Sequence, residues 1–177
     1  LGDVYKRQKI KRVIVSTYQA VSGAGKEGID ELDAQVRDHS EGREMTANIL
    51  PSASAEKHYP IAFNLIPQID VFCDNLYTKE EMKMVNETKK IMEDYEMRIT
   101  ATTIRVPVYR SHSESVNIEL EKEVDLGAMR EALAKFPGVT VQDDPSKQEY
   151  PMPLYTSEKD DVYVGRLRRD ESCEKSY

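Results

Sequence analysis

Apolar and polar positions along the first forty residues change from a strand-like to a helix-like pattern. The run from Lys11 to Thr17 (KRVIVST) is short, apolar and β-branched, which predicts a strand. From about Gly25 to Arg37, apolar residues recur at i, i+3 and i+7, as on one side of an amphipathic helix. The cluster Ser22 to Gly25 lies between the two patterns. The first unit is therefore predicted to be a strand, a glycine-rich turn and a helix.

Prolines interrupt the apolar pattern in the middle of the chain. His58 to Pro67 and Gln68 to Cys73 are apolar runs broken by proline, so we expect a buried loop and strand suited to a subunit contact, with Cys73 as an inert buried thiol. Thr78 to Glu81 is a capping box that opens a helix through about Asp94. Its predicted apolar side is formed by Met82, Val85, Ile91 and Met92.

The second half of the chain again alternates strand and helix patterns. We predict strands at Arg98 to Arg105 and Ser115 to Leu120, and a helix from Asp125, as its N-cap, to Lys135. Met129 and Leu133 are its inward residues. Two further strands are predicted at 139–142 and 162–168, separated by a polar, proline-broken segment. Together these elements predict an α+β fold, with a mixed β-sheet and helices packed on one face.

The stretch from Thr102 to Val116 places two reactive side chains near each other. Arg105 ends one predicted strand, and His112 follows seven positions later. Pro107 cannot donate a ladder hydrogen bond, so the chain should bend between them and bring both to one site. Arginine matches a carboxylate or phosphate, and histidine exchanges a proton near neutral pH. The alternative is a salt-bridged surface arginine and a structural histidine.

Gly23 to Gly28 (GAGKEG) matches the Gly-x-Gly-x-x-Gly dinucleotide fingerprint. That fingerprint requires a second strand after the helix, whereas a polar stretch from His39 to Lys57 follows here. We therefore favour a glycine-rich helix entry that allows close backbone approach. Free backbone N–H groups at a helix N-terminus would also suit an anionic ligand.

On the next helix, Glu80 and Lys83 share one face at i, i+3. A surface ion pair of small energetic value is the favoured interpretation. The functional alternative is a carboxylate and an ammonium presented together to a zwitterionic or phosphorylated ligand.

Composition narrows the function classes. The net charge is −7 with a pI of about 5.1, and no basic face is visible, which argues against a general nucleic-acid binder. No apolar run approaches the roughly 20 residues that span a bilayer, so no membrane association is expected. No metal-ligand spacing is present. Two cysteines and no secretion signal predict a reduced, cytoplasmic protein.

The two ends carry less pattern than the rest. Residues 1–8 (LGDVYKRQ) do not join the first strand pattern, and we expect a non-native or disordered lead. Residues 171–177 stop without a cap or breaker and are expected to be a truncated tail. We therefore predict one domain at 9–170.

Four segments, in this order and spacing, resemble the C-terminal catalytic and dimerisation domain of the aspartate-semialdehyde dehydrogenase family: STYQAVSGAG (16–25), HYPIAFNLIPQIDVF (58–72), KEEMKMVNETKKI (79–91) and RVPVYRSHSESV (105–116). The resemblance runs from about Lys9 to Asp170. It implies the glyceraldehyde-3-phosphate-dehydrogenase type of C-terminal domain. It also implies the NADPH-dependent reduction of L-aspartyl 4-phosphate to L-aspartate 4-semialdehyde, through a cysteine thioester, in the biosynthesis of lysine, methionine, threonine and diaminopimelate.

The resemblance also implies roles for individual residues. Gln19 would orient the substrate near the reacting carbon, and Arg105 would clamp its α-carboxylate. Glu80 would bind the amino end of the substrate, and Lys83 its phosphate. His112 would be the acid/base catalyst that serves the cysteine and hydride-transfer steps. The expected contacts with the nicotinamide side of NADP come from Ser22 and Gly23, and the expected assembly is a homodimer or homotetramer.

The chain departs from the family pattern in one respect that concerns activity. The family's coenzyme domain and nucleophilic cysteine lie before the glutamine segment, and only eighteen residues precede Gln19 here. Neither Cys73 nor Cys173 stands in the nucleophile motif. We therefore expect a chain that holds substrate-binding and acid/base residues and shows no dehydrogenase activity by itself.

Two other functions remain open from the sequence. One is a reductase of the N-acetylglutamyl-phosphate type, against which the Glu80 and Lys83 pair and the spacing from Arg105 to His112 favour the aspartate enzyme. The other is a non-catalytic module for dimerisation or anion binding.

Overall fold

The computed structural model describes residues 9–177, which form two compact units. Unit 1 comprises residues 9–14, 96–99 and 116–177, and unit 2 comprises residues 15–95 and 100–115. The expectation of a non-native or disordered lead at 1–8 falls outside the described residues. None of the helices in residues 9–177 combines the length and the apolarity needed to cross a lipid bilayer.

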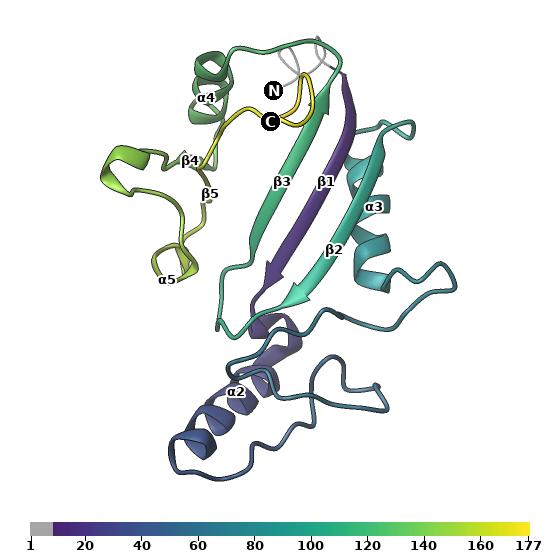
Figure 1. Cartoon of the computed structure of the whole chain (residues 1–177), viewed down its shortest axis with the longest axis vertical. Coiled ribbons are helices and arrows are strands. Elements are labelled where there is room, and N and C mark those ends of the chain that lie inside the picture. Colours follow the sequence, from purple (N-terminus) through teal and green to yellow (C-terminus); the bar gives the residue numbers. More distant parts are fainter. Residues whose placement is uncertain (1–8) are drawn as a thin grey trace. The chain divides into compact units, whose positions relative to one another are not determined.

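Three strands form one sheet in the order β2-β1-β3. They are β1 (Ile10–Gln19), β2 (Arg98–Arg105) and β3 (Ser113–Leu120). β1 and β2 run in the same direction and β3 runs in the opposite one, so the sheet is mixed (Figure 1). The predicted α+β class with a mixed sheet is confirmed. β2 has the predicted bounds, whereas β1 and β3 are longer than predicted.

The glycine-rich turn after β1 is a short 3-10 helix, η1 (Val21–Ala24), which leads directly into α2 (Gly25–Ser40). Gly28 lies against this turn, and a Cβ atom there would come within 2.7 Å of the Val21 carbonyl oxygen. The absence of a side chain on Gly28 therefore lets the backbone of the helix approach the turn closely, as predicted. α2 extends three residues beyond the predicted end at Arg37.

The core of unit 2 forms where η1 and α2 pack against the irregular segment that follows α2. Its buried apolar residues are Val21, Leu32, Leu50, Ile61, Ala62 and Ile66. The fully buried Gln35 on α2 accepts hydrogen bonds from the backbone N–H groups of Ile61 and Ala62, at 2.8 and 3.0 Å. A long segment without regular structure is thereby fixed to the helix.

The segment from residue 58 to 78 is irregular, with isolated bridges from Ile66 to Arg105 and from Phe72 to Thr78. Ile61, Ile66 and Ile69 are buried. The prediction of a buried loop is only partly right, because Phe63, Leu65 and Phe72 are more than half exposed. The predicted strand reduces to single bridges. Cys73 is half-buried rather than buried.

Helix α3 (Lys79–Ile91) begins with the predicted capping box. The Thr78 hydroxyl accepts from the Glu81 N–H, and the Glu81 carboxylate accepts from the Thr78 N–H at 2.8 Å. The predicted apolar side is only partly right. Met82 and Val85 are half-buried, whereas Ile91 is 76% exposed and Met92 is 43% exposed, because the helix ends at Ile91.

Unit 1 contains α4 (Leu126–Ala134), the short parallel strands β4 (Val139–Val141) and β5 (Val162–Val164), η2 (Pro145–Lys147) and α5 (Pro153–Thr156). Asp125 is the N-cap of α4, as predicted, and its side chain accepts from the Ala128 N–H. Met129 and Leu133 are half-buried.

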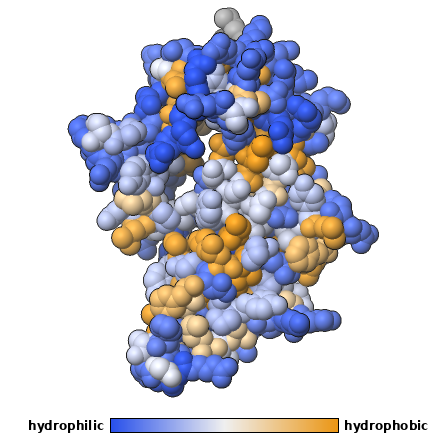
Figure 2. Space-filling model, in the orientation of Figure 1, coloured by the Kyte–Doolittle hydropathy of each residue, from blue (hydrophilic) through white to orange (hydrophobic). Residues whose placement is uncertain are grey.

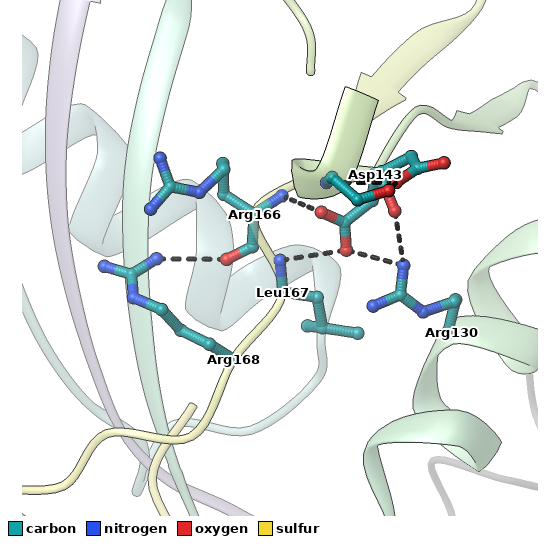
Figure 3. A network of polar contacts seen from close by, with 7 residues as sticks. Arg130, Asp143, Arg166, Leu167 and Arg168 are labelled. Atoms are coloured by element: carbon teal, nitrogen blue, oxygen red, sulfur yellow. Dashed lines mark hydrogen bonds and ion pairs between the residues drawn. The ribbon is translucent and has the colours of Figure 1, made fainter. Parts of the chain in front are cut away.

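The strand predicted at 162–168 ends at Val164, because the buried carboxylate of Asp143 accepts hydrogen bonds from the backbone N–H groups that follow. The Asp143 side chain, 2% exposed, accepts hydrogen bonds from the N–H groups of Arg166 and Leu167 and pairs with the Arg130 guanidinium at 2.7 Å (Figure 3). Arg166 has a positive φ of 60°, which a strand does not allow. A side-chain acceptor thus replaces the strand ladder beyond Val164.

The last residues of the chain pair with β3. The N–H and C=O groups of Ile118 exchange two hydrogen bonds with those of Tyr177, at 2.9 Å each. Tyr177 is 7% exposed, and its hydroxyl donates to the Val124 carbonyl oxygen at 2.7 Å. The prediction of a truncated tail at 171–177, which stops without a cap or breaker, did not include this pairing.

Candidate functional site

The site starts where two adjacent strands end. Gln19 is the last residue of β1 and Arg105 the last of β2, and the Val106 N–H donates to the Gln19 carbonyl oxygen at 3.0 Å. Because β1 and β2 run in the same direction, both side chains are delivered to one end of the sheet (Figure 1). The site residues described below all belong to unit 2.

Arg105 is a buried cation without an acidic partner. Its side chain is 4% exposed, and its Nη1 donates to the Ala20 carbonyl oxygen at 2.7 Å. Its Nε is buried with no hydrogen-bond partner, and within residues 9–177 no carboxylate lies at ion-pair distance from the guanidinium. Burial lowers the pKa of Arg105, and the negative charge of Glu80 partly restores it. The guanidinium retains donors for an anionic ligand.

The loop after Arg105 bends back and brings His112 to the same place. The N–H groups of Val21 and Ser22 donate to the carbonyl oxygens of Val108 and Tyr109, at 2.8 and 3.1 Å. The Ala20 N–H donates to His112 Nδ1 at 2.9 Å. The predicted bend between Arg105 and His112, and their convergence, are therefore confirmed.

His112 is exposed at its outer edge, yet its pKa lies below the usual value. Loss of hydration on the enclosed side of the ring lowers this pKa most, and the positive charge of Arg105 lowers it further. The negative charge of Glu80 acts in the opposite direction. The imidazole is therefore biased towards its neutral form.

Glu80 presents its carboxylate to this group from the first turn of α3. Its Oε1 accepts from Gln19 Nε2 at 3.3 Å, and its Oε2 lies 3.7 Å from Lys83 Nζ. The predicted ion pair between Glu80 and Lys83 is therefore present, with a 56% exposed lysine side chain. The negative charge of Glu80 also acts on Arg105 and His112, where it raises both pKa values against the effect of burial.

The turn η1 supplies the remaining predicted residues, Ser22 and Gly23. Ser22 is half-buried and Gly23 is exposed. A Cβ atom on Gly23 would lie 2.7 Å from Arg105 Nη1 and 3.5 Å from His112 Cε1. Any larger residue at position 23 would therefore displace the guanidinium.

Glu81 is a supporting residue whose second role the sequence did not reveal. Beyond its capping bond, its Oε1 accepts from the Thr103 N–H at 3.0 Å, two residues before Arg105 on β2. Its carboxylate is 8% exposed and thus joins the helix that carries Glu80 to the strand that carries Arg105. The capping-box motif predicted only the contact between Glu81 and Thr78, and not the bond to Thr103.

Neither cysteine is assigned to this group of residues. Cys73 is half-buried, with its N–H bonded to the Tyr77 carbonyl oxygen, and Cys173 is exposed in unit 1. Within the described part of the chain, no three His, Cys, Asp or Glu side chains are grouped so that they could hold a metal ion.

Comparisons with a family model and with curated proteins all match this chain to semialdehyde dehydrogenases. The family model of the semialdehyde dehydrogenase dimerisation domain matches residues 1–177. Aspartate-semialdehyde dehydrogenase of Bacillus subtilis is 50% identical over 171 residues, which cover 96% of this chain and 49% of that protein. The enzyme of the same name from Helicobacter pylori strain J99 is 51% identical over 174 residues, or 96% of this chain and 50% of that protein.

Among solved structures, aspartate semialdehyde dehydrogenase II of Vibrio cholerae, complexed with ASA, superposes with a TM-score of 0.87 at 39% identity. The match covers 98% of this chain and 49% of that one. The chain thus spans about half the length of the relatives it matches. By this family match and these identities, the chain belongs to the semialdehyde dehydrogenase dimerisation-domain family.

Proposed function

We propose that this chain provides the substrate-binding half of an aspartate-semialdehyde dehydrogenase active site. The reaction is the NADP-dependent reductive dephosphorylation of L-aspartyl 4-phosphate to L-aspartate 4-semialdehyde, in the cytoplasmic biosynthesis of lysine, methionine, threonine and diaminopimelate. One observation supports it above the others. Arg105 is a buried guanidinium without a carboxylate partner, adjoined by the acceptor Glu80 and by His112.

The charges match the ends of an amino-acid substrate. The α-carboxylate pairs with the donors that Arg105 leaves unused, which gives the buried cation its missing counter-charge. The α-ammonium pairs with Glu80, whose carboxylate is oriented by Gln19. An amino acid that carries both charges therefore suits this site better than a simple anion does.

The reacting end of the substrate is assigned to the other residues. Gln19 orients the carbonyl group, and Lys83, a largely exposed ammonium, binds the phosphate as a point charge. His112 serves the carbonyl oxygen as its charge develops. Ser22 and Gly23 contact the coenzyme on the nicotinamide side. The absence of a side chain on Gly23 makes room for the Arg105 guanidinium. NADPH, when bound, supplies the hydride.

We assign no reaction step to Cys73 or Cys173, so the purified chain is expected to show no NADPH oxidation with L-aspartyl phosphate. Activity should appear when the chain is mixed or co-expressed with the N-terminal half of the Bacillus subtilis relative, which contributes the coenzyme domain that the family resemblance implies. We also propose a homodimer or homotetramer as the assembled form.

The test is an NADPH oxidation assay on the chain alone, on the N-terminal half alone, and on both together. The expected result is activity only in the combination, and its loss with Arg105→Ala but not with Arg169→Ala. N-acetylglutamyl phosphate should not replace the aspartyl substrate. Oxidation by the chain alone, or an active combination that is indifferent to Arg105→Ala, would contradict the proposal.

A further inference from the structure

A hollow in unit 1 is lined by three arginines. It has a volume of about 310 Å³, at the lower end of the range of about 300 to 1,000 Å³ that small-molecule sites occupy. Arg130, Arg166 and Arg168 line it, together with Tyr150 and a single carboxylate, that of Asp143. Three positive charges and one negative charge therefore surround this arginine hollow, in a chain whose net charge is −7. Positive charge concentrated in a concave surface attracts anions.

The one carboxylate of the hollow forms an ion pair only with Arg130. Asp143 Oδ2 lies 2.7 Å from Arg130 Nη1, and the same carboxylate accepts hydrogen bonds from the N–H groups of Arg166 and Leu167 at 2.8 and 3.3 Å (Figure 3). Within residues 9–177, no carboxylate lies at ion-pair distance from the guanidinium of Arg166 or of Arg168. Among the described residues, two of the three positive charges thus lack a counter-charge.

The two unpaired guanidinium groups lie on the same side of the segment that carries them. Arg168 Nη1 donates to the Arg166 carbonyl oxygen at 3.0 Å, which folds the Arg168 side chain back beneath Arg166 (Figure 3). Arg168 also acts electrostatically on Asp170, whose low pKa comes first from hydrogen bonds donated by Ser172 and then from one donated by Asn117. Since a guanidinium has five N–H donors, most donors of Arg166 and Arg168 remain available to a ligand.

The backbone that presents these two arginines is tightly constrained. A Cβ atom on Gly165 would collide with the Gln142 carbonyl oxygen and come within 2.6 Å of Pro151 Cδ, so the chain passes close to both. The next residue, Arg166, has a φ of 60°, and its N–H is bonded to the buried Asp143 carboxylate. A ligand that binds here therefore meets a backbone that is already ordered, which reduces the entropic cost of binding.

We propose that the arginine hollow of unit 1 binds a phosphate group between Arg166 and Arg168. A carboxylate has two oxygens, which satisfy the fork of one guanidinium, whereas a phosphate has enough oxygens to pair with two forks at once. The phosphate is either free orthophosphate or part of a small phosphate ester, whose organic part would contact Tyr150 and Leu167. This inference is independent of the proposed function, because it uses no residue of the group around Arg105.

An NMR titration of the purified 15N-labelled chain tests the proposal at the site itself. The amide signals of Arg166 and Leu167 are followed with orthophosphate, glycerol 3-phosphate and succinate, each against sodium chloride at matched ionic strength. Saturable shifts with a Kd of about 5 mM or tighter are expected for a phosphate, with at least tenfold weaker binding of succinate. Saturation by orthophosphate alone would identify the free ion as the ligand, and equal or tighter binding of glycerol 3-phosphate would identify an ester.

Charge variants decide whether the two arginines hold the ligand. The double variant Arg166→Gln with Arg168→Gln should weaken phosphate binding at least tenfold, read at the Leu167 amide. Both side chains are exposed and the backbone bonds to Asp143 remain, so the fold should persist. Arg169→Gln is the matched control, because Arg169 is already paired with Glu123. The proposal is overturned by the absence of saturable shifts with either phosphate, by equally tight binding of succinate, or by full affinity in the double variant.

Discussion

At the scale of single residues, the charges of Arg105 and Glu80 both act on the His112 ring. The positive charge of Arg105 lowers the pKa of His112, and the negative charge of Glu80 raises it. Removing either charge should therefore shift this pKa in the opposite direction from removing the other. Arg105→Gln should raise the pKa of His112, and Glu80→Gln should lower it. NMR titration of the His112 ring in both variants checks the two signs. Glu87→Gln, an exposed carboxylate on the same helix, serves as the control, and shifts of the same sign in both site variants would contradict the geometry.

The lowered pKa of His112 also makes the stability of the fold depend on pH. Because the unfolded chain binds a proton more readily than the folded one, this residue contributes stability above its unfolded pKa of about 6.5, and the contribution is lost as the pH falls below that value. The contribution should disappear in His112→Gln.

Gly23 gives a second prediction at this scale. Gly23→Ala places a methyl group 2.7 Å from Arg105 Nη1, so the guanidinium must move. The affinity for L-aspartate 4-semialdehyde should fall by about tenfold or more, which corresponds to about 1.4 kcal/mol. Calorimetric titration of both proteins measures the change. Gly127→Ala on α4 is the matched control, and equal affinity of Gly23→Ala and the wild-type chain would exclude Gly23 as a constraint on Arg105.

At the scale of elements, Glu81 links helix α3 to strand β2. Glu81→Ala removes the capping bond to Thr78 and the bond to Thr103, and leaves buried N–H groups unpaired. It should lower the free energy of unfolding by about 2 to 6 kcal/mol, from about 1 to 3 kcal/mol for each of the two unpaired N–H groups. Denaturant unfolding gives this value.

Thr78→Ala tests the hydroxyl cap alone, because both bonds of the Glu81 carboxylate remain in this variant. It removes the cap acceptor for the Glu81 N–H, at a cost of about 1 kcal/mol, but keeps the bond between Glu81 and Thr103. If the link to β2 positions Glu80, Thr78→Ala should leave the affinity for semialdehyde unchanged while Glu81→Ala weakens it. An equal loss of affinity in the two variants would show that only the cap matters.

The sequence was most informative where local signals and tertiary structure agree. The β2 bounds, the Thr78 cap and the bend at Pro107 each follow from a few neighbouring residues. The end of β5 could not be predicted in this way. It depends on Asp143, which is separated from Arg166 by more than twenty residues and replaces the strand ladder through its side chain (Figure 3).

The same limit applies to the site itself. The convergence of Arg105 and His112 was predictable from Pro107, because the bend is local. The contacts of Ala20 could not be predicted, because nothing in the sequence indicates which hydrogen bonds the backbone of a small apolar residue makes. The second bond of Glu81 likewise depends on a strand that follows far along the chain.

At the scale of the whole molecule, apolar side chains remain uncovered. Figure 2 shows apolar patches within a largely hydrophilic surface. In unit 2, Phe63 is 67% exposed and Leu65 is 56% exposed, and both line a surface hollow with Asn64 and Pro107. Exposed apolar patches of this kind are uncommon on monomers. The purified chain is therefore expected to self-associate.

Light scattering at several protein concentrations measures the association. The wild-type chain should have a mass above 20.3 kDa, and the double variant Phe63→Ser with Leu65→Ser should shift towards that value. Tyr155→Ser, an exposed aromatic residue of unit 1, is the control. A monodisperse wild-type monomer would contradict the expectation.

We propose that the residues around Arg105 bind an amino acid through both of its charged ends. The most direct test is a calorimetric titration of the purified chain with L-aspartate 4-semialdehyde, beside succinic semialdehyde, which lacks the amino group. L-aspartate 4-semialdehyde should bind with a Kd of about 1 mM or tighter, and succinic semialdehyde at least tenfold more weakly. Arg105→Ala should lose this affinity. Equal affinity for the two aldehydes, or binding that survives Arg105→Ala, would contradict the proposal.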